Sequence, residues 1–398
     1  MSTSYLAILG GNLMACPAIG QLRQAGYSVL VVDGNPDAPA KTRADRFINV
    51  DFLDVEKTRA ALSDIQLLGI IPLNDFSMRA AFAICRERRL PTWSEQGLRC
   101  ATSKVAMKTA WLNAGLATAR CAFSTVEDIL SGRNPAWDQF PCVVKPSFSG
   151  GGSRGVFIAK DWNDARTKLV EVRPTFLEGD VVIEEFIEGT EHTLEVLVQN
   201  ETPHLLSISD KENYPGSATV VQNLYFPGPI GSELRSVIEP LAYAACRAMG
   251  MTNGTCHFEV LIRNGTPFLL EVGGRPGGGL NFHPICELST GYNYPSLLAQ
   301  ILTGRRLDLK KKPSAHLAWH YFPAGSGILK SVEGFESLRD EPDVVDAMLY
   351  ETIGQPRFRL RDDLARPGYV LVKADSHERA RTRARELIDR VHFVTESQ

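Results

Sequence analysis

Two apolar segments, each containing a single glutamate, flank an Asn-Gly pair in the second half of the chain. The first segment is His257–Ile262, with Glu259, and the second is Phe268–Val272, with Glu271. An Asn-Gly pair between two such runs is a strong signal for a β-hairpin. A carboxylate inside an apolar strand is costly unless a cation or another partner meets it. The pattern therefore predicts a hairpin whose two acidic groups hold a cation.

The length of the turn decides whether the two glutamates face each other, because side chains alternate along a strand. A two-residue turn pairs Glu259 with Leu270 and points Glu271 to the opposite face. A turn of three residues, with Gly265 in the left-handed conformation, pairs Glu259 directly with Glu271. We expect the three-residue turn, Asn264–Thr266.

In this register His257 lies opposite Gly273, and Arg275 follows on the same face. Two carboxylates on directly paired residues repel each other, so a divalent cation is expected between or beside them. The arginine lies in a glycine-rich bend, and a guanidinium group binds phosphate or carboxylate oxygens bidentately. The alternative is an ordinary hairpin whose glutamates lie on a solvent-exposed face.

Composition is that of an ordinary soluble protein of two or three domains. The 398 residues carry a formal net charge of −3, which does not favour nucleic-acid or membrane partners, and no apolar run reaches membrane-spanning length. The eight cysteines include no C-x-x-C pair, which argues for reduced thiols. The N-terminus has neither a basic n-region nor a cleavage-site pattern. We therefore expect a cytoplasmic protein.

The first hundred residues alternate between strands and helices. We expect strands at Tyr5–Leu9, Tyr27–Asp33, Ile48–Asp51 and Gly69–Asn74, and helices at Pro17–Ala25 and Ser77–Arg89. This order is typical of a parallel α/β sheet. Because the G-x-G-x-x-G fingerprint is absent after the first strand, a nicotinamide-dependent oxidoreductase is disfavoured. The strand ends at 10–12 and 74–77 are candidates to hold a small substrate.

A lysine precedes a glycine-rich loop in the next segment. The expected strand Cys142–Pro146 contains Lys145, and a second strand covers Val156–Ala159. The loop between them contains Ser149, Gly150, Gly151, Gly152 and Ser153. A charged lysine in an apolar strand needs an anion, and free backbone amides of a mobile loop add anion contacts. The order differs from a Walker loop, in which the lysine follows the glycines. A plain hairpin with a flexible tip is the alternative.

Two further segments carry candidate ligand groups. A helix is expected from Ser103 to near Gly115, with Lys104 and Lys108 on one face, and a solvated face is the alternative. An apolar strand then runs into an acidic connector that contains Glu184, Glu185, Phe186 and Ile187. Backbone groups near Glu185 and Ile187 suit the edge of an adenine, and Glu191 suits ribose hydroxyls. The alternative is an acidic turn between strands.

The remaining chain continues as mixed α and β structure. Strands are expected at His192–Gln199, His204–Ser209, His316–Phe322 and Gly368–Val372, and helices at Leu234–Met249 and Ser376–Val391. The segment Tyr214–Gly231 is rich in Pro, Gly and Asn, and we expect a long loop there.

Taken in order, these segments resemble the ATP-grasp superfamily. The marks are Lys104 or Lys108, Lys145 before a glycine loop, the 184–187 connector, Glu259, and Glu271 leading to Arg275. The resemblance covers nearly the whole chain and is strongest to carboxylate–amine ligases of the amino-acid ligase type. It implies an α/β protein with an ATP-grasp fold, in which two α+β subdomains sandwich ATP, preceded by a Rossmann-like parallel α/β domain. The expected domains are residues 1–100, 101–205 and 206–398.

The resemblance also implies a reaction. The γ-phosphoryl group of ATP passes to a substrate carboxylate, an amine attacks the acyl phosphate, and ADP and phosphate are released. Lys104 or Lys108, together with Lys145, would hold the α- and β-phosphates under the glycine loop. Glu259 and Glu271 would bind Mg²⁺, with Mn²⁺ as an alternative. Arg275 would bind the γ-phosphoryl group or the substrate carboxylate, with Lys211 as a weaker candidate for the same cluster. A homodimer is expected by family analogy.

One position departs from the family pattern. Two residues after the second metal-binding glutamate the family usually has Asn, and this chain has Gly273. Water can replace the missing oxygen, so one Mg²⁺ is expected and a second is left open. Three rival functions share the fold: a purine-pathway ligase using Lys41, Arg43 and Arg46, a bicarbonate-using carboxylase, and a non-catalytic nucleotide-binding module. The chain offers no biotin-lysine segment for a carboxylase.

Overall fold

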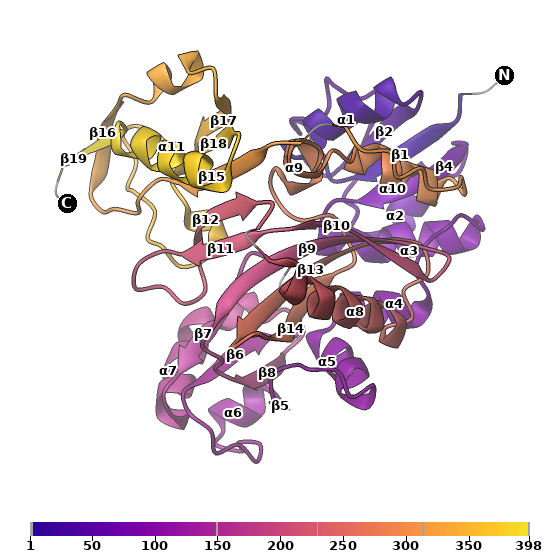
Figure 1. The fold of residues 1–398 in the computed structure, drawn as a ribbon. Coiled ribbons are helices and arrows are strands. Elements are labelled where there is room, and N and C mark those ends of the chain that lie inside the picture. The colour runs from indigo at the N-terminus through magenta and orange to yellow at the C-terminus, as the bar shows by residue number, and fades with distance from the viewer. Residues whose placement is uncertain (1–2, 149, 229, 313, 397–398) are drawn as a thin grey trace.

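The N-terminal part of the computed structural model is a doubly covered parallel sheet (Figure 1). The structure describes residues 3–148, 150–228, 230–312 and 314–396. Four parallel strands have the order β3-β2-β1-β4. They are β1 Tyr5–Leu9, β2 Ser28–Asp33, β3 Arg46–Asn49 and β4 Leu67–Pro72, with helices α1 Ala15–Gln24, α2 Val55–Ala61 and α3 Met78–Glu87. In β1, Leu6 and Ile8 pack toward α1, while Ala7 and Leu9 pack toward α3. Both faces of the sheet are therefore buried, as the apolar strands predict.

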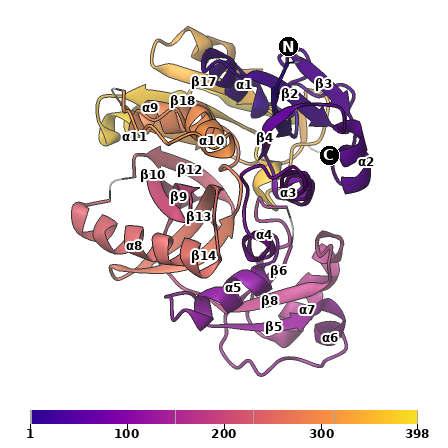
Figure 2. The same ribbon diagram turned by 90° about the vertical axis from the view of Figure 1, so that its right-hand side faces the viewer.

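Two short helices lead from this domain to a smaller antiparallel sheet. The helices are α4 Glu95–Ala101 and α5 Lys104–Asn113, and Figure 2 shows them between the N-terminal sheet and the smaller sheet. The sheet has the order β5-β8-β6-β7. Its strands are β5 Cys121–Thr125, β6 Cys142–Pro146, β7 Phe157–Ala159 and β8 Asp180–Glu185, with helices α6 Val126–Leu130 and α7 Trp162–Val172 packed against it.

A nine-stranded sheet forms the largest part of the molecule. Its order is β14-β13-β9-β11-β12-β15-β18-β17, with β10 paired to β9. The strands are β9 Thr190–Gln199, β10 Thr202–Ile208, β11 Asp210–Asn213, β12 Val221–Phe226, β13 Gly254–Arg263, β14 Thr266–Gly273, β15 His316–Tyr321, β17 Val344–Leu349 and β18 Gly368–Ala374. The helices of this part are α8 Ser232–Ala248, α9 Cys286–Thr290, α10 Tyr294–Leu302 and α11 His377–Asp389. A two-stranded sheet, β16 Ile328–Glu333 with β19 His392–Glu396, lies beyond it.

The expected long loop at 214–231 is wrong, because β12 forms within it. The strand pairs with both β11 and β15, and Leu224 and Phe226 are buried. Pairing on both sides overrides the loop-like composition of the flanking residues. The domain boundaries at residues 100 and 205 remain a proposal. Among the described residues, no helix combines the length and apolar character that a membrane span requires.

Candidate functional site

The β13–β14 hairpin turns over two residues, so the expected three-residue turn is wrong. Arg263 pairs with Thr266, and both turn residues have positive φ, 52° at Asn264 and 76° at Gly265. These angles are those of a type I′ turn, which fits the twist of the strands.

A β-bulge nevertheless brings the two glutamates together as expected. Val260 pairs with Leu269, the register then shifts, and Glu259 pairs with Glu271. Leu270 is therefore the extra residue of a bulge, and it supplies the one-residue shift that we had expected from the turn. His257 consequently pairs with Gly273, and the predicted register at the acidic pair is confirmed.

Each of these carboxylates has a lysine beside it. Glu271 Oε1 lies 3.0 Å from Lys104 Nζ, and Glu259 Oε1 lies 3.3 Å from Lys211 Nζ. Ser103 accepts a hydrogen bond from the Ala106 amide and caps α5, which fixes Lys104 in the first turn of that helix. Burial alone would raise the pKa of Glu259, but Lys211 and other positive groups outweigh it and lower the pKa to about 2. The acidic pair therefore lies ionised among positively charged side chains.

Lys211 is held in place by a second carboxylate. It pairs across β11 and β9 with Glu191, and its ammonium contacts that carboxylate as well as Glu259. Burial opposes the charged form of Lys211, but the two glutamates outweigh burial and raise its pKa. Lys211 is therefore a fixed cation between the predicted ribose contact and the predicted metal contact.

A buried ion triad lies on the opposite sheet. Glu184 Oε1 pairs with Lys108 Nζ and Glu184 Oε2 pairs with Lys145 Nζ, each at 2.7 Å. Lys108 is fully buried and also donates to Thr118 Oγ1 at 2.7 Å and to the Leu269 carbonyl at 3.3 Å. Burial lowers the pKa of Lys108. Its position supports a bracing role, which leaves Lys104 as the candidate of the two for phosphate.

Lys145 lies at the cleft side of this triad. Burial alone would lower the pKa of Lys145, but Glu184, followed by Glu271, outweighs burial and raises it. Lys104 and Lys211 therefore each contact one carboxylate of the hairpin, and the negative charge of Glu271 helps to keep Lys145 protonated.

Glu184 and Glu185 are the last residues of β8 rather than part of a connector, and Glu185 bonds to the residue before β5. Glu185 accepts a hydrogen bond from the Arg120 amide at 3.1 Å and one from Gln139 Nε2 at 3.4 Å, and its own amide donates to the Arg120 carbonyl. Ile187 is buried and Phe186 is half-buried. These bonds leave the backbone of Phe186 and Ile187 as the candidates to contact a nucleotide base.

The glycine loop lies against the N-terminal domain. A Cβ at Gly150 would come within 2.1 Å of the Phe76 ring, and Arg154 stacks over the same ring at 5.5 Å. Gly152 accepts a hydrogen bond from the Asp363 amide at 3.2 Å, and Ser153 has a φ of 56°. Ser149 lies outside the described residues.

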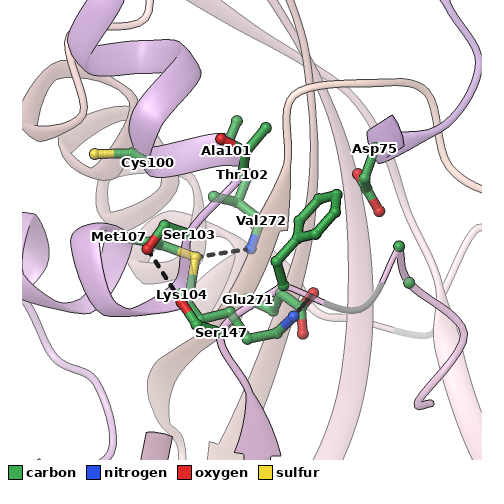
Figure 3. A pocket seen from close by; sticks show the side chains of 13 residues that line it. Asp75, Cys100, Ala101, Thr102, Ser103, Lys104, Met107, Ser147, Glu271 and Val272 are labelled. Carbon is green, nitrogen blue, oxygen red and sulfur yellow. Dashed lines mark hydrogen bonds and ion pairs between the residues drawn. The ribbon is translucent and has the colours of Figure 1, made fainter. Parts of the chain in front are cut away.

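Beneath this loop is a narrow cavity, whose lining side chains Figure 3 shows. Its lining residues are Asp75, Cys100, Ala101, Thr102, Ser103, Lys104, Met107, Ser147, Phe148, Gly150, Gly151, Glu271 and Val272. The Lys104 and Glu271 side chains meet at one end, and Asp75 lies across from them (Figure 3). The cavity joins the N-terminal domain, the glycine loop and the hairpin.

One buried network was missed by the sequence predictions. Glu195 accepts hydrogen bonds from Tyr294 at 2.9 Å and from the Gly277 amide at 3.2 Å, and it pairs with His257 Nδ1 at 2.6 Å. It fixes His257 and the start of the Gly277–Gly279 bend. The sequence does carry a signal, because Glu195 is flanked by apolar residues of its strand, as Glu259 is.

Two family models match the chain. Residues 138–283 match an ATP-grasp domain, and residues 320–396 match L-amino acid ligase C-terminal domain 2. Among curated proteins, a D-alanine–D-alanine ligase of Cupriavidus taiwanensis is 29% identical over 240 residues, covering 54% of this chain and 67% of that protein. The ligase of the same name from Anaeromyxobacter is 28% identical over 294 residues, covering 72% of this chain and 89% of that protein.

Solved structures show the same fold over the full length. The L-amino acid ligase of Bacillus licheniformis aligns with a TM-score of 0.84 at 22% identity, covering 100% of this chain and 99% of that one. The phosphoribosylglycinamide synthetase of Anaerococcus prevotii aligns with a TM-score of 0.75 at 19% identity, covering both chains completely. The chain therefore contains an ATP-grasp domain and an L-amino acid ligase C-terminal domain 2, and over its full length it has the fold of these solved ATP-dependent ligases.

Proposed function

We propose that this protein is an ATP-dependent carboxylate–amine ligase. It activates a small carboxylic or amino acid as an acyl phosphate and joins it to an amine, releasing ADP and phosphate. The observation that carries this proposal is the direct pairing of Glu259 with Glu271, with Lys104 and Lys211 each in contact with one of the two carboxylates. Phosphoryl transfer requires neutralisation of charge and alignment of groups, and this cluster supplies both.

The two glutamates fit Mg²⁺. Among the described residues no group of three or more His, Cys, Asp or Glu side chains is placed to hold a metal, so the protein would contribute the hairpin pair alone. Mg²⁺ suits such a site, because it commonly takes one or two carboxylates and completes its shell with phosphate oxygens and water. When bound, it would neutralise phosphate charge, and Mn²⁺ could replace it. Glu259 and Glu271 would hold it.

The lysines and the glycine loop would hold the phosphates. Lys104 and Lys145 would hold the α- and β-phosphates, and Lys211 and Arg275 would bind the γ-phosphoryl group. An oxygen of the substrate carboxylate attacks the γ-phosphorus, and the bond to ADP breaks. The amine nitrogen then attacks the acyl carbon, loses a proton, and phosphate departs. The loop over the cavity excludes the water that would otherwise hydrolyse the acyl phosphate.

The nucleoside would lie at the far end of the same cleft. Phe186 and Ile187 would border the proposed adenine position through their backbone, and Glu191 is close enough to Lys211 to join the ribose to the phosphate cluster. Glu184 pairs with Lys145 and is proposed to affect the nucleotide only by positioning this lysine.

The relatives favour an amino acid as one substrate, because their names describe the joining of amino acids. The purine-pathway neighbours share the fold at low identity, and no residue contact favours their reaction here. A homodimer and a cytoplasmic location are further proposals by analogy with the similar proteins.

The test is a matrix of amino acids and small acids assayed in pairs. Phosphate release with Mg²⁺ and ATP is measured for each acid, each amine and each pair, and product masses are recorded. The proposal expects phosphate release and an amide product only when both partners are present. Tight ATP binding without any amide product across the matrix would favour a nucleotide-binding module, and dependence on bicarbonate would favour a carboxylase.

A further inference from the structure

The N-terminal domain places a carboxylate on the arginine of the phosphoryl site. Asp75 lies just after β4, in the short 3-10 turn Asp75–Ser77. Asn74 accepts a hydrogen bond from the Ser77 amide at 2.9 Å and caps this turn, which fixes the direction of Asp75. Arg275 Nε donates to Asp75 Oδ1 at 3.1 Å, and Nη2 donates to Oδ2 at 3.4 Å. The carboxylate therefore accepts two hydrogen bonds from one edge of the guanidinium group.

The contact with Asp75 fixes the orientation of the remaining N–H donors of Arg275. Nη1 donates to the Pro276 carbonyl at 3.1 Å. Among the described residues these bonds use three of the five N–H groups of the arginine and leave one on each terminal nitrogen. Two such groups are what bidentate binding of a phosphoryl or carboxylate oxygen pair requires.

The ion pair is enclosed by two glycines. A Cβ at Gly151 of the loop would lie 3.1 Å from Arg275 Nη2 and 3.2 Å from Asp75 Oδ2. A Cβ at Gly273 would lie 3.2 Å from Arg275 Cζ and 3.2 Å from Asp75 Oδ1. The pair therefore occupies the space of a side chain at 273, where the family pattern has Asn. The Asp75 and Arg275 side chains are only 10% and 14% exposed, so little water competes for the contact.

We propose that Asp75 is a positioning residue that acts through Arg275. Asp75 binds one edge of the guanidinium group and thereby orients the other edge toward the γ-phosphoryl group of ATP. The resulting ion pair also packs against Gly151 of the loop. The inference rests on the proposed function. The proposal makes the N-terminal domain a part of the phosphoryl-transfer site, with Asp75 acting through Arg275 rather than by contact with ATP or the acid.

The test compares Asp75→Asn with Glu351→Gln. Glu351 is an equally buried carboxylate that pairs with Arg357 at 2.9 Å within the C-terminal part of the chain. Titration calorimetry with Mg²⁺ measures the affinity for ADP and for a non-hydrolysable ATP analogue. Asp75→Asn should leave ADP affinity unchanged and lower the preference for the triphosphate by about tenfold, since a misplaced guanidinium group no longer meets the γ-phosphoryl group. Glu351→Gln should keep the wild-type preference.

Turnover gives a second readout. Asp75→Asn should lower kcat by on the order of 10- to 100-fold, with the KM values for acid and amine kept. The double variant Asp75→Asn with Arg275→Ala should be no worse than Arg275→Ala alone. Additive losses would overturn the proposal, and so would a raised KM for the acid with unchanged kcat, which would place Asp75 on the substrate.

Gly151→Ala covers the case in which Asp75→Asn does not fold. It disturbs the ion pair from the loop side without changing a charge, and it should reproduce the loss of triphosphate preference. An unchanged preference in this variant would contradict the inference. Because the calorimetric readout needs only nucleotide binding, it separates failure of this inference from failure of the ligase proposal.

Discussion

Glu184 and Lys145 form a buried ion pair, with 2.7 Å between Oε2 and Nζ. The other oxygen of Glu184 meets Lys108 at the same distance, so one carboxylate balances two lysines. Burial alone would raise the pKa of Glu184, but the two lysines outweigh burial and lower it. The glutamate therefore stays ionised and holds Lys145 at the edge of the cleft.

Replacing Glu184 should destabilise the protein. Glu184→Gln leaves Lys108 buried without its counter-charge, and breaking a buried pair in this way costs about 3 kcal/mol or more. Urea denaturation monitored by circular dichroism measures the loss. Glu185→Gln, one residue along and half-buried, is the control and should cost less than about 1 kcal/mol. Equal losses for the two variants would contradict the bracing role.

Lys104 and Lys108 should differ in their effect on ATP binding. Lys104 lines the cavity, whereas Lys108 is enclosed behind Glu184. Lys104→Met should weaken ATP binding measured by calorimetry by about tenfold, as expected when one charged phosphate contact worth about 1.5 kcal/mol is lost. Lys108→Met keeps the apolar stem and should change ATP affinity by a smaller factor. A larger effect from Lys108→Met would reverse the assignment.

Lys145→Ala should weaken ATP binding and slow phosphoryl transfer. The ammonium contacts Glu184, and its loss at desolvated phosphates should cost about 2 kcal/mol or more. Steady-state kinetics with ATP varied measures this as a rise in KM and a fall in kcat. Wild-type values for both would remove Lys145 from the phosphate site.

Glu271→Ala should abolish turnover while the fold is kept. The side chain is 29% exposed at the cleft, and its removal leaves Glu259 as the sole hairpin carboxylate for the metal. Phosphate release reports activity, and circular dichroism reports the fold. Glu233→Ala, at an exposed glutamate in the first turn of α8, is the control and should keep full activity. Undiminished turnover in Glu271→Ala would remove the metal assignment.

Acid should destabilise the protein in part through His320. Burial, aided by Arg385 and Arg381, lowers the pKa of His320 to about 3, against 6.5 for an unperturbed histidine. The neutral ring in the folded state contacts the Tyr225 hydroxyl at 3.0 Å. As the pH falls, His320 is protonated in the unfolded chain before it is protonated in the folded protein. The contribution of its neutral ring to the free energy of unfolding is therefore fully present above pH 6.5. It falls as the pH drops toward 3, by up to about 1.4 kcal/mol per pH unit.

His320→Gln keeps a donor for Tyr225 and removes the titration. Urea midpoints at pH 7.5 and 5.5 should therefore differ less in this variant than in the wild type. An equal pH dependence in the two proteins would contradict the assignment.

Local patterns in the sequence were sufficient for the fold class and for the order of the site elements. The apolar runs predicted the strands, Lys145 before the glycines predicted the loop, and the lone Glu259 and Glu271 predicted an acidic hairpin. The ATP-grasp assignment is confirmed by the family match. These features are readable because they rest on periodicity and on the cost of burying a charge, which neighbouring residues already determine.

Contacts between distant segments were decided by the tertiary structure alone. The bulge at Leu270 leaves no sequence signal, since it arises where β13 is paired to β9 as well as to β14. The choice between Lys104 and Lys108 depends on which turn of α5 lies beside Glu184 on β8 and which lies beside Glu271. The Asp75–Arg275 pair joins residues two hundred positions apart. Such contacts depend on how whole domains pack, and no local pattern encodes that arrangement.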